Sequence, residues 1–134
     1  MDIRELEEGK QLMPQFEKRG GLLPVAVQEQ STGQILMLAS VNKEALEITL
    51  NTKRATFWST SRRELWTKGL TSGDVLLIKD VLIDCDQDAL IYQVELEGNG
   101  SCHTFANNGE VRKACFYRKL NFVNNELEFI KGME

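Results

Sequence analysis

Two mainly apolar stretches near the N-terminus, separated by a short polar turn, predict the first part of a β-sheet. Residues 22–30 (LLPVAVQEQ) and residues 34–40 (QILMLAS) have the pattern of extended segments. The tripeptide STG separates them and provides Gly33, which can adopt the positive φ that a tight turn needs. The two segments are therefore predicted to pair as a hairpin.

Helical spacing of apolar residues marks two further segments. Residues 3–16 carry apolar side chains at partly helical intervals, which predicts a short N-terminal helix. Residues 43–53 (KEALEITLNTK) place Ala45, Leu46 and Leu50 on one face. Asn42 precedes them as an N-cap, because its side-chain oxygen can accept from a free backbone N–H of the first turn. This second segment is predicted to be an amphipathic helix.

Strand-like segments dominate the second half of the chain. They cover residues 55–60, 75–84, 90–98, 101–105 and 114–120, and they are separated by polar loops at 61–73 and 107–113. The tail from residue 121 onward has no clear pattern. Without repeats or linkers, residues 1–134 are predicted to form a single α+β domain with a mostly antiparallel β-sheet and a few short helices.

Composition places the chain among soluble globular proteins. Of its 134 residues, 42% are hydrophobic and 27% are charged, which is enough for one core and a solvated surface. The net charge of −4 argues against nucleic-acid binding. No apolar run reaches the ~18 residues that a membrane helix needs, and the acidic N-terminus lacks the order of a signal peptide. We therefore expect a cytoplasmic protein with no nucleic-acid or membrane partner.

The stretch DCDQDA (84–89) places three carboxylates at alternate positions. In an extended chain Asp84, Asp86 and Asp88 share one face, while Cys85 points the other way. Carboxylates suit Mg²⁺ or Ca²⁺, and a thiolate suits Zn²⁺. A solvated acidic turn is an equal alternative. An EF-hand loop is disfavoured, because Ala89 stands where that loop needs glycine and because the flanking segments are strand-like.

The chain has three cysteines, an odd number that cannot pair completely within one chain, and thiols stay reduced in the expected cytoplasmic compartment. Cys85, Cys102 and Cys115 lack CxxC spacing, and each taken alone is more simply a small buried apolar residue. Together, three thiolates would leave a tetrahedral zinc ion one open position, which is the catalytic arrangement. His103 is the only histidine and follows Cys102 directly, so it could act as a general acid or base.

The loop SRRELWTKGLTSG (61–73) can supply charged, hydroxyl and backbone donors to a phosphate, and its tryptophan can stack on a base. It lacks the residue order of a Walker loop. An exposed loop with a partly buried tryptophan is the alternative interpretation. The candidate substrate-binding residues are Arg62, Arg63, Trp66, Lys68, Thr71, Ser72 and Gly73.

Several ordered motifs together resemble the phosphoribosyl-AMP cyclohydrolases of histidine biosynthesis. They are WSTSRRELWTKGLTSG (58–73), DCDQDA (84–89), CHT (102–104) and CFYR (115–118). Residues 22–46 also resemble the family's opening, so that the resemblance covers roughly residues 21–119. It implies a hydrolase that opens the adenine ring of N1-(5-phosphoribosyl)-AMP at the N1–C6 bond. It also implies an intertwined homodimer.

The same resemblance implies two metal cofactors, Zn²⁺ and Mg²⁺. Zinc would be shared between subunits, with Cys85 from one chain and both Cys102 and Cys115 from the other. Zinc lowers the pKa of bound water from 15.7 to about 7, so that a hydroxide can attack C6 near neutral pH. His103 would transfer the protons. The implied magnesium ligands are Asp84, Asp86 and Asp88.

This chain departs from the family pattern in three regions. Phe105 replaces the glycine that usually follows CHT, and twelve residues separate Cys102 from Cys115, more than is usual. Leu70 replaces a usual glutamate before TSG, and Val41 replaces the methionine of the family's MN. Because every implied metal ligand is present, we expect an active enzyme. A non-enzymatic calcium or zinc module and a degenerate relative that serves as an interaction protein are the alternatives.

Overall fold

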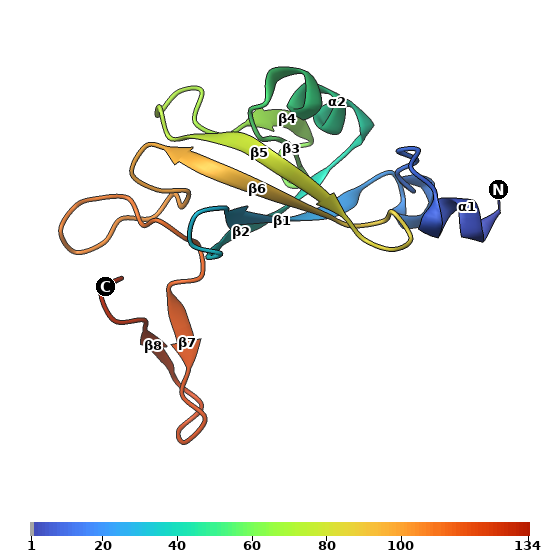
Figure 1. The fold of residues 1–134 in the computed structure, drawn as a ribbon. Helices are drawn as coiled ribbons and strands as arrows, with labels where there is room; N and C mark the ends of the chain where they lie inside the picture. Colours follow the sequence, from blue (N-terminus) through green and yellow to red (C-terminus); the bar gives the residue numbers. More distant parts are fainter. Residues whose placement is uncertain (1) are drawn as a thin grey trace.

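The computed structural model describes residues 2–134 and is built on a four-stranded sheet with the strand order β2-β1-β6-β5 (Figure 1). The strands are β1 (Leu23–Glu29), β2 (Ile35–Val41), β5 (Val75–Ile83) and β6 (Leu90–Glu97). The pairs β1–β2 and β5–β6 are antiparallel hairpins, and the first of them is the hairpin that the sequence predicts. The two hairpins join through a parallel pairing of β1 with β6.

One face of the sheet is covered by helix α2 (Lys43–Thr52) and by a further hairpin that is not part of the sheet (Figure 1). Asn42 caps the helix as predicted, because its Oδ1 accepts from the backbone N–H of Ala45 at 2.8 Å. Ala45 and Leu46 are buried on the face that the spacing indicated. The helix therefore closes the core over β2 and β3.

Strand β3 (Thr56–Ser59) pairs with β4 (Glu64–Thr67), a segment that the sequence analysis placed in a polar loop. That prediction was wrong, because Trp66 stands opposite Phe57 in the hairpin and packs on it with 5.3 Å between ring centroids. Phe57 is fully buried and lies 6.1 Å from the ring of Tyr92 on β6. Tertiary packing thus converts a short polar segment into a strand.

The N-terminal helix is shorter than predicted. Helix α1 covers Ile3–Glu8, and only a 3₁₀ turn, η1 (Glu17–Arg19), follows before β1. The helix ends at Gly9, where a Cβ would lie 2.4 Å from the carbonyl oxygen of Glu5. None of its residues is buried, so no tertiary packing extends it toward residue 16.

The C-terminal region also differs from the prediction. Of the expected strand over 114–120, only Arg118–Leu120 (β7) forms, and it pairs with β8 (Leu127–Phe129). The segment before it turns inward instead, because the Cys115 N–H donates to the Leu36 carbonyl at 2.7 Å. The predicted strand at 101–105 is reduced to a single bridge between Phe105 and Val111.

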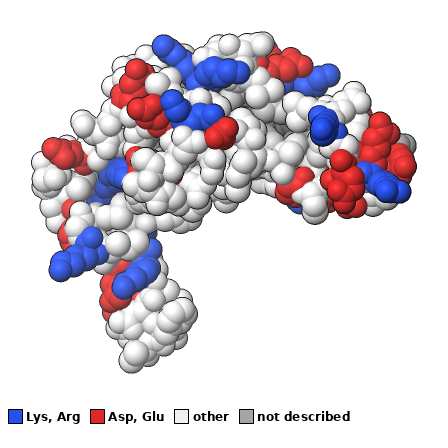
Figure 2. Space-filling view, viewed as in Figure 1, with Lys and Arg blue, Asp and Glu red and all other residues white. Residues whose placement is uncertain are grey.

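The β7–β8 hairpin projects from the sheet (Figure 1), and its tip carries no charged side chain in Figure 2. Phe122 and Val123 at this tip are 87% and 95% exposed. The prediction of one α+β domain with mostly antiparallel strands is confirmed for the part of the chain that the structure describes. Within residues 2–134, no helix has the length and apolar character needed to span a bilayer.

Phe57 is expected to anchor the β3–β4 hairpin to the sheet. Phe57→Ala should lower the free energy of unfolding by about 3–5 kcal/mol, because it leaves a cavity among fully buried side chains. Phe105→Ala is the matched control, since Phe105 is largely exposed and its loss should cost less than about 0.5 kcal/mol. Chemical denaturation of both variants checks the difference, and equal effects would contradict the assigned packing.

Candidate functional site

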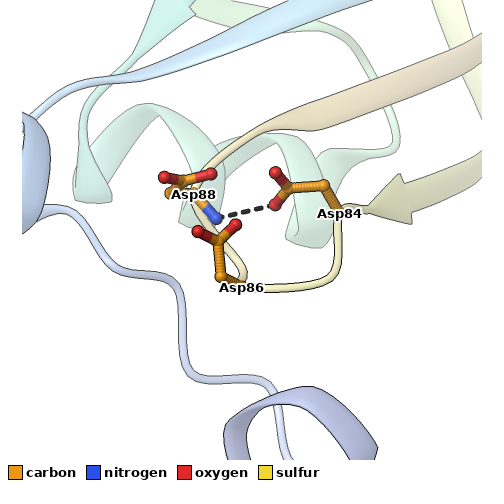
Figure 3. Close-up of side chains that lie close together, drawn as sticks. All are labelled: Asp84, Asp86 and Asp88. Carbon is orange, nitrogen blue, oxygen red and sulfur yellow. Dashed lines mark hydrogen bonds between the residues drawn. The ribbon is translucent and has the colours of Figure 1, made fainter. Parts of the chain in front are cut away.

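The acidic stretch 84–89 is the loop that joins β5 to β6. It is not extended as the alternation argument assumed, because Ile83 pairs with Leu90 and the chain must reverse within six residues. The carboxylate of Asp84 accepts from the N–H of Asp88 at 2.8 Å (Figure 3) and from the N–H of Ala89 at 3.0 Å, which closes the loop. The curled backbone, rather than strand alternation, brings the three carboxylates together.

Carboxylate oxygens of Asp84, Asp86 and Asp88 lie within 4.8 Å of one another (Figure 3). The Asp88 side chain is nearly inaccessible, whereas Asp84 is exposed and Asp86 is partly buried. Loss of solvent around the carboxyl group, together with the nearby Asp88 carboxylate, raises the pKa of Asp84 above its ordinary value. Such a cluster of hard oxygen donors suits a Mg²⁺ or Ca²⁺ ion.

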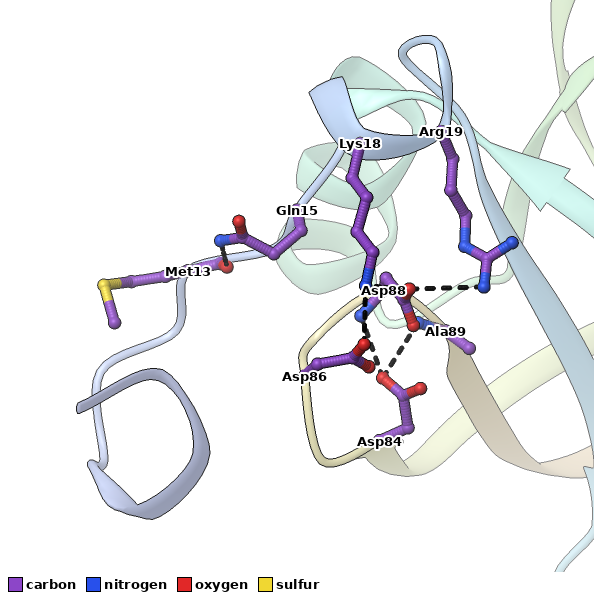
Figure 4. A network of polar contacts seen from close by, with 8 residues as sticks. All are labelled: Met13, Gln15, Lys18, Arg19, Asp84, Asp86, Asp88 and Ala89. Atoms are coloured by element: carbon purple, nitrogen blue, oxygen red, sulfur yellow. Dashed lines mark hydrogen bonds and ion pairs between the residues drawn. The ribbon is translucent and has the colours of Figure 1, made fainter. Parts of the chain in front are cut away.

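Two cationic side chains from the η1 turn face this cluster (Figure 4). The ammonium of Lys18 lies 2.6 Å from Asp86 and 2.9 Å from Asp88, and Arg19 lies 3.2 Å from Asp88. Hydrogen bonds to these carboxylates raise the pKa of Lys18 well above its usual range, and the Lys18 ammonium holds the pKa of Asp88 well below its own. The Lys18 ammonium thus occupies the position that a metal ion bound to these carboxylates would take.

Gln87 ties the N-terminal segment to the acidic loop. Its buried side chain donates to the carbonyl of Leu6 at 3.0 Å and accepts from the N–H of Met13 at 2.7 Å. Its own carbonyl accepts from the N–H of Gln15 at 2.8 Å. Sequence reasoning missed Gln87, Lys18 and Arg19, because their contacts join segments far apart in the chain.

Cys102 and Cys115 lie next to each other at the opposite end of the sheet. Backbone bonds from Ser101 to Lys113 and from Cys102 to Arg112 fold the long segment between them into a closed loop. Burial raises the pKa of the Cys102 thiol, but hydrogen bonds from Thr104 outweigh it, so the pKa falls below its ordinary value. Burial and the neighbouring Cys102 sulfur raise the pKa of Cys115 to about 11.

Cys85 does not join this pair. It is exposed in the loop before β6, whereas Cys102 follows the end of the same strand. Eight residues of β6 lie between these loops, which corresponds to roughly 26 Å of extended chain. Among residues 2–134, three ligating groups gather only at the acidic loop. A single subunit therefore presents two of the three thiols together.

A cavity of about 570 Å³ connects the basic loop with His103. A cavity of this size can hold a nucleotide-sized ligand. Lys68 is only 9% exposed, and it lies close enough to Cys115 to oppose the rise in that thiol's pKa. The cavity therefore adjoins the thiol pair. The predicted residues that line it are Arg62, Trp66, Lys68, Thr71, Ser72 and His103.

Two predicted substrate residues do not line this cavity. Arg63 is exposed at the β3–β4 turn, where its φ is 56°, and Gly73 occupies a turn with a φ of 83°. Leu65, Thr67, Gly69 and Leu70 line it instead. Leu65 and Thr67 belong to β4, which the sequence analysis did not predict as a strand.

Comparison with known proteins places this geometry in a family. The family model described as phosphoribosyl-AMP cyclohydrolase matches residues 37–117. The phosphoribosyl-AMP cyclohydrolase of Desulfatibacillum aliphaticivorans is 50% identical over 103 residues, which cover 77% of this chain and 78% of that protein. That of Cenarchaeum symbiosum is 49% identical over 105 residues, 78% of this chain and 91% of the relative.

A bifunctional relative also matches. The histidine biosynthesis bifunctional protein HisIE of Thermus thermophilus is 48% identical over 112 residues, which cover 84% of this chain but only 49% of that protein. The chain thus corresponds to about half of the bifunctional protein. With the family model and the relatives in agreement over most of its length, the chain belongs to the phosphoribosyl-AMP cyclohydrolase family.

Proposed function

We propose that this protein is a cytoplasmic, zinc- and magnesium-dependent homodimer that hydrolyses the N1–C6 bond of N1-(5-phosphoribosyl)-AMP in histidine biosynthesis. The observation that carries the proposal is one cavity, lined by the basic loop and His103 and adjoining two thiols, in a member of this family. The cavity combines donors for a phosphorylated nucleotide with groups suited to hydrolysis.

Donors of the 61–73 loop bind the substrate. Arg62, Thr71 and Ser72 offer guanidinium and hydroxyl donors to phosphate or ribose oxygens, and the partly buried Trp66 offers an aromatic face to the purine. Within residues 2–134 no carboxylate lies within ion-pairing distance of the Lys68 ammonium. Lys68 is therefore free to stabilise an anion, either a thiolate beside it or a substrate phosphate.

The thiols fit a zinc site completed by a second subunit. Cys102 and Cys115 supply two sulfur donors, and the remote Cys85 is available to a partner chain. When bound, zinc supplies a water molecule that ionises near neutral pH. His103 lines the cavity beside Cys102 and can accept a proton from the attacking water and deliver one to N1.

An uncovered apolar row on the sheet supports the homodimer. Leu38, Ala26, Ile91 and Leu82 stand side by side across all four strands. Their face is opposite to the one that α2 covers, because the neighbouring Val25 and Val27 point into the core. Leu38 and Leu82 are exposed in the single chain, so pairing of two subunits would remove apolar surface from water.

The carboxylates of the acidic loop fit Mg²⁺, which would neutralise a substrate phosphate or orient the substrate. Lys18 lies where such an ion would bind, so metal entry requires the ammonium to move aside. Asp84, Asp86 and Asp88 are the proposed ligands. The metal site and the N-terminal segment are therefore linked.

Metal removal tests the activity itself. The purified protein is expected to open the adenine ring of phosphoribosyl-AMP, followed by absorbance, and a chelator should abolish the reaction. Adding Zn²⁺ and Mg²⁺ back should restore it. Metal binding without turnover after this restoration would instead favour a non-enzymatic metal module or a degenerate relative.

Mixing inactive variants tests the shared zinc site. Cys85→Ser and Cys102→Ser chains should form mixed dimers with one intact site, which gives about a quarter of wild-type activity under random pairing. Cys102→Ser mixed with Cys115→Ser is the matched control, because both ligands belong to the same half-site and no intact site can form. Equal activity in both mixtures, after mass spectrometry has shown that mixed dimers formed, contradicts the sharing of zinc between subunits.

Replacing Lys18 tests the acidic loop. Lys18→Met removes the ammonium that competes for Asp86 and Asp88, so Mg²⁺ should bind roughly 2- to 10-fold more tightly in a calorimetric titration. Lys79→Met is the control, because Lys79 pairs with Glu95 away from the loop. Unchanged or weaker binding in Lys18→Met would contradict competition between the Lys18 ammonium and a divalent ion for these carboxylates.

A further inference from the structure

Arg112 lies within the long segment between Cys102 and Cys115, and its guanidinium contacts three separate parts of the chain. Its Nε donates to the carbonyl of Met133 at 2.8 Å, and its Nη1 donates to the hydroxyl of Thr104 at 3.1 Å. The guanidinium carbon lies 4.1 Å from the centroid of the Tyr117 ring, a distance at which a cation is attracted to the ring face. These contacts fix the plane of the guanidinium group.

Backbone hydrogen bonds hold Arg112 opposite Cys102. The N–H of Cys102 donates to the Arg112 carbonyl at 3.1 Å, and the N–H of Arg112 donates to the Thr104 carbonyl at 3.0 Å. A Cβ on Gly100 would lie 2.3 Å from the Arg112 oxygen, so the two backbones approach as closely as glycine allows. Arg112 is therefore placed by the fold and not by its side-chain contacts alone.

The direction of the Thr104 hydroxyl follows from these contacts. Thr104 Oγ1 lies 3.0 Å from Cys102 Sγ as well as 3.1 Å from Arg112. A guanidinium group has donors and no acceptor, so the Thr104 oxygen must accept from Arg112. The hydroxyl oxygen has a second lone pair that a protonated thiol could use, but the thiolate that binds zinc has no proton to donate, so the O–H of Thr104 donates to that sulfur. The Thr104 backbone N–H points at the same sulfur from 3.4 Å.

We propose that Arg112 is a positioning residue, which orients the Thr104 hydroxyl so that it donates to the Cys102 sulfur and holds that sulfur for zinc. The inference rests on the proposed zinc site and names how this chain supports it. Partners that orient a metal ligand from outside the coordination sphere typically contribute 10- to 100-fold to metal affinity.

The same contacts connect the C-terminal segment with the thiol pair. Met133 accepts from Arg112, the Glu134 carbonyl accepts from the N–H of Asn107, and the Phe129 ring lies 5.4 Å from the guanidinium carbon. Residues 118–134 lie beyond the part that the family model matches. In this chain they support the metal site through Arg112.

Zinc affinity, measured by competition with a chromophoric chelator on the full-length protein, tests the inference. Arg112→Met should bind zinc roughly 10- to 100-fold more weakly. Arg118→Met is the matched control, because Arg118 lies 5.6 Å from the same Tyr117 ring but does not contact Thr104. Thr104→Val should lose a similar factor, whereas Thr104→Ser keeps the hydroxyl and should bind zinc as the wild type does.

The double variant Arg112→Met/Thr104→Val separates positioning from general destabilisation. If Arg112 acts through Thr104, the double variant should bind zinc about as weakly as Thr104→Val alone. The inference would be overturned if the losses of zinc affinity in the two single variants multiplied in the double variant. It would also be overturned by an unchanged zinc affinity in Arg112→Met or by an equal loss in Arg118→Met. If Arg112→Met fails to fold, the comparison of Thr104→Val with Thr104→Ser decides.

The outcome for the wild type separates this inference from the proposed function. A wild-type protein that binds no zinc would refute both the zinc-dependent function and the role of Arg112. A wild type that binds zinc and opens the adenine ring, with an Arg112→Met variant of equal zinc affinity, would refute the role of Arg112 alone.

Discussion

The parallel pairing of β1 with β6 determines where the acidic loop and its cationic neighbours lie. Val25 pairs with Leu90, and the register continues to Glu29 and Val94. Because parallel strands begin at the same edge of a sheet, the segments before β1 and before β6 must meet there. One of these segments is the η1 turn with its two cations, and the other is the acidic loop. The ion pairs between them are a consequence of this register.

The same strand separates the two sets of metal donors. The acidic loop with Cys85 precedes β6, and the segment with Cys102 follows it, so they lie at opposite ends of the sheet. No rearrangement of side chains could close a distance set by the length of a strand. The proposed zinc site with three thiolates would therefore need a second subunit, and the uncovered row with Leu38 and Leu82 is the apolar surface proposed for it.

The local elements of the fold were predictable, because their causes are local. Asn42 caps the helix that follows it, and alternation with a Gly33 turn produces the first hairpin. Strand β4 was not predictable, because its residues form a strand only when Trp66 packs on Phe57. The contacts of Lys18 with Asp86 escaped the sequence analysis for the same reason, since no local pattern pairs residues so far apart.

The sequence by itself determined the chemistry that is available: three carboxylates in one short stretch, three thiols, one histidine, and a basic loop with a tryptophan. Side-chain chemistry is a property of each residue, so it can be read without a structure. Only the tertiary structure decided which groups meet. Strand register and core packing place the carboxylates in a curled loop, bring the Cys102 thiol beside the Cys115 thiol, and bring Arg112 to Thr104. These choices depend on hydrogen bonds between distant segments, which no local pattern encodes.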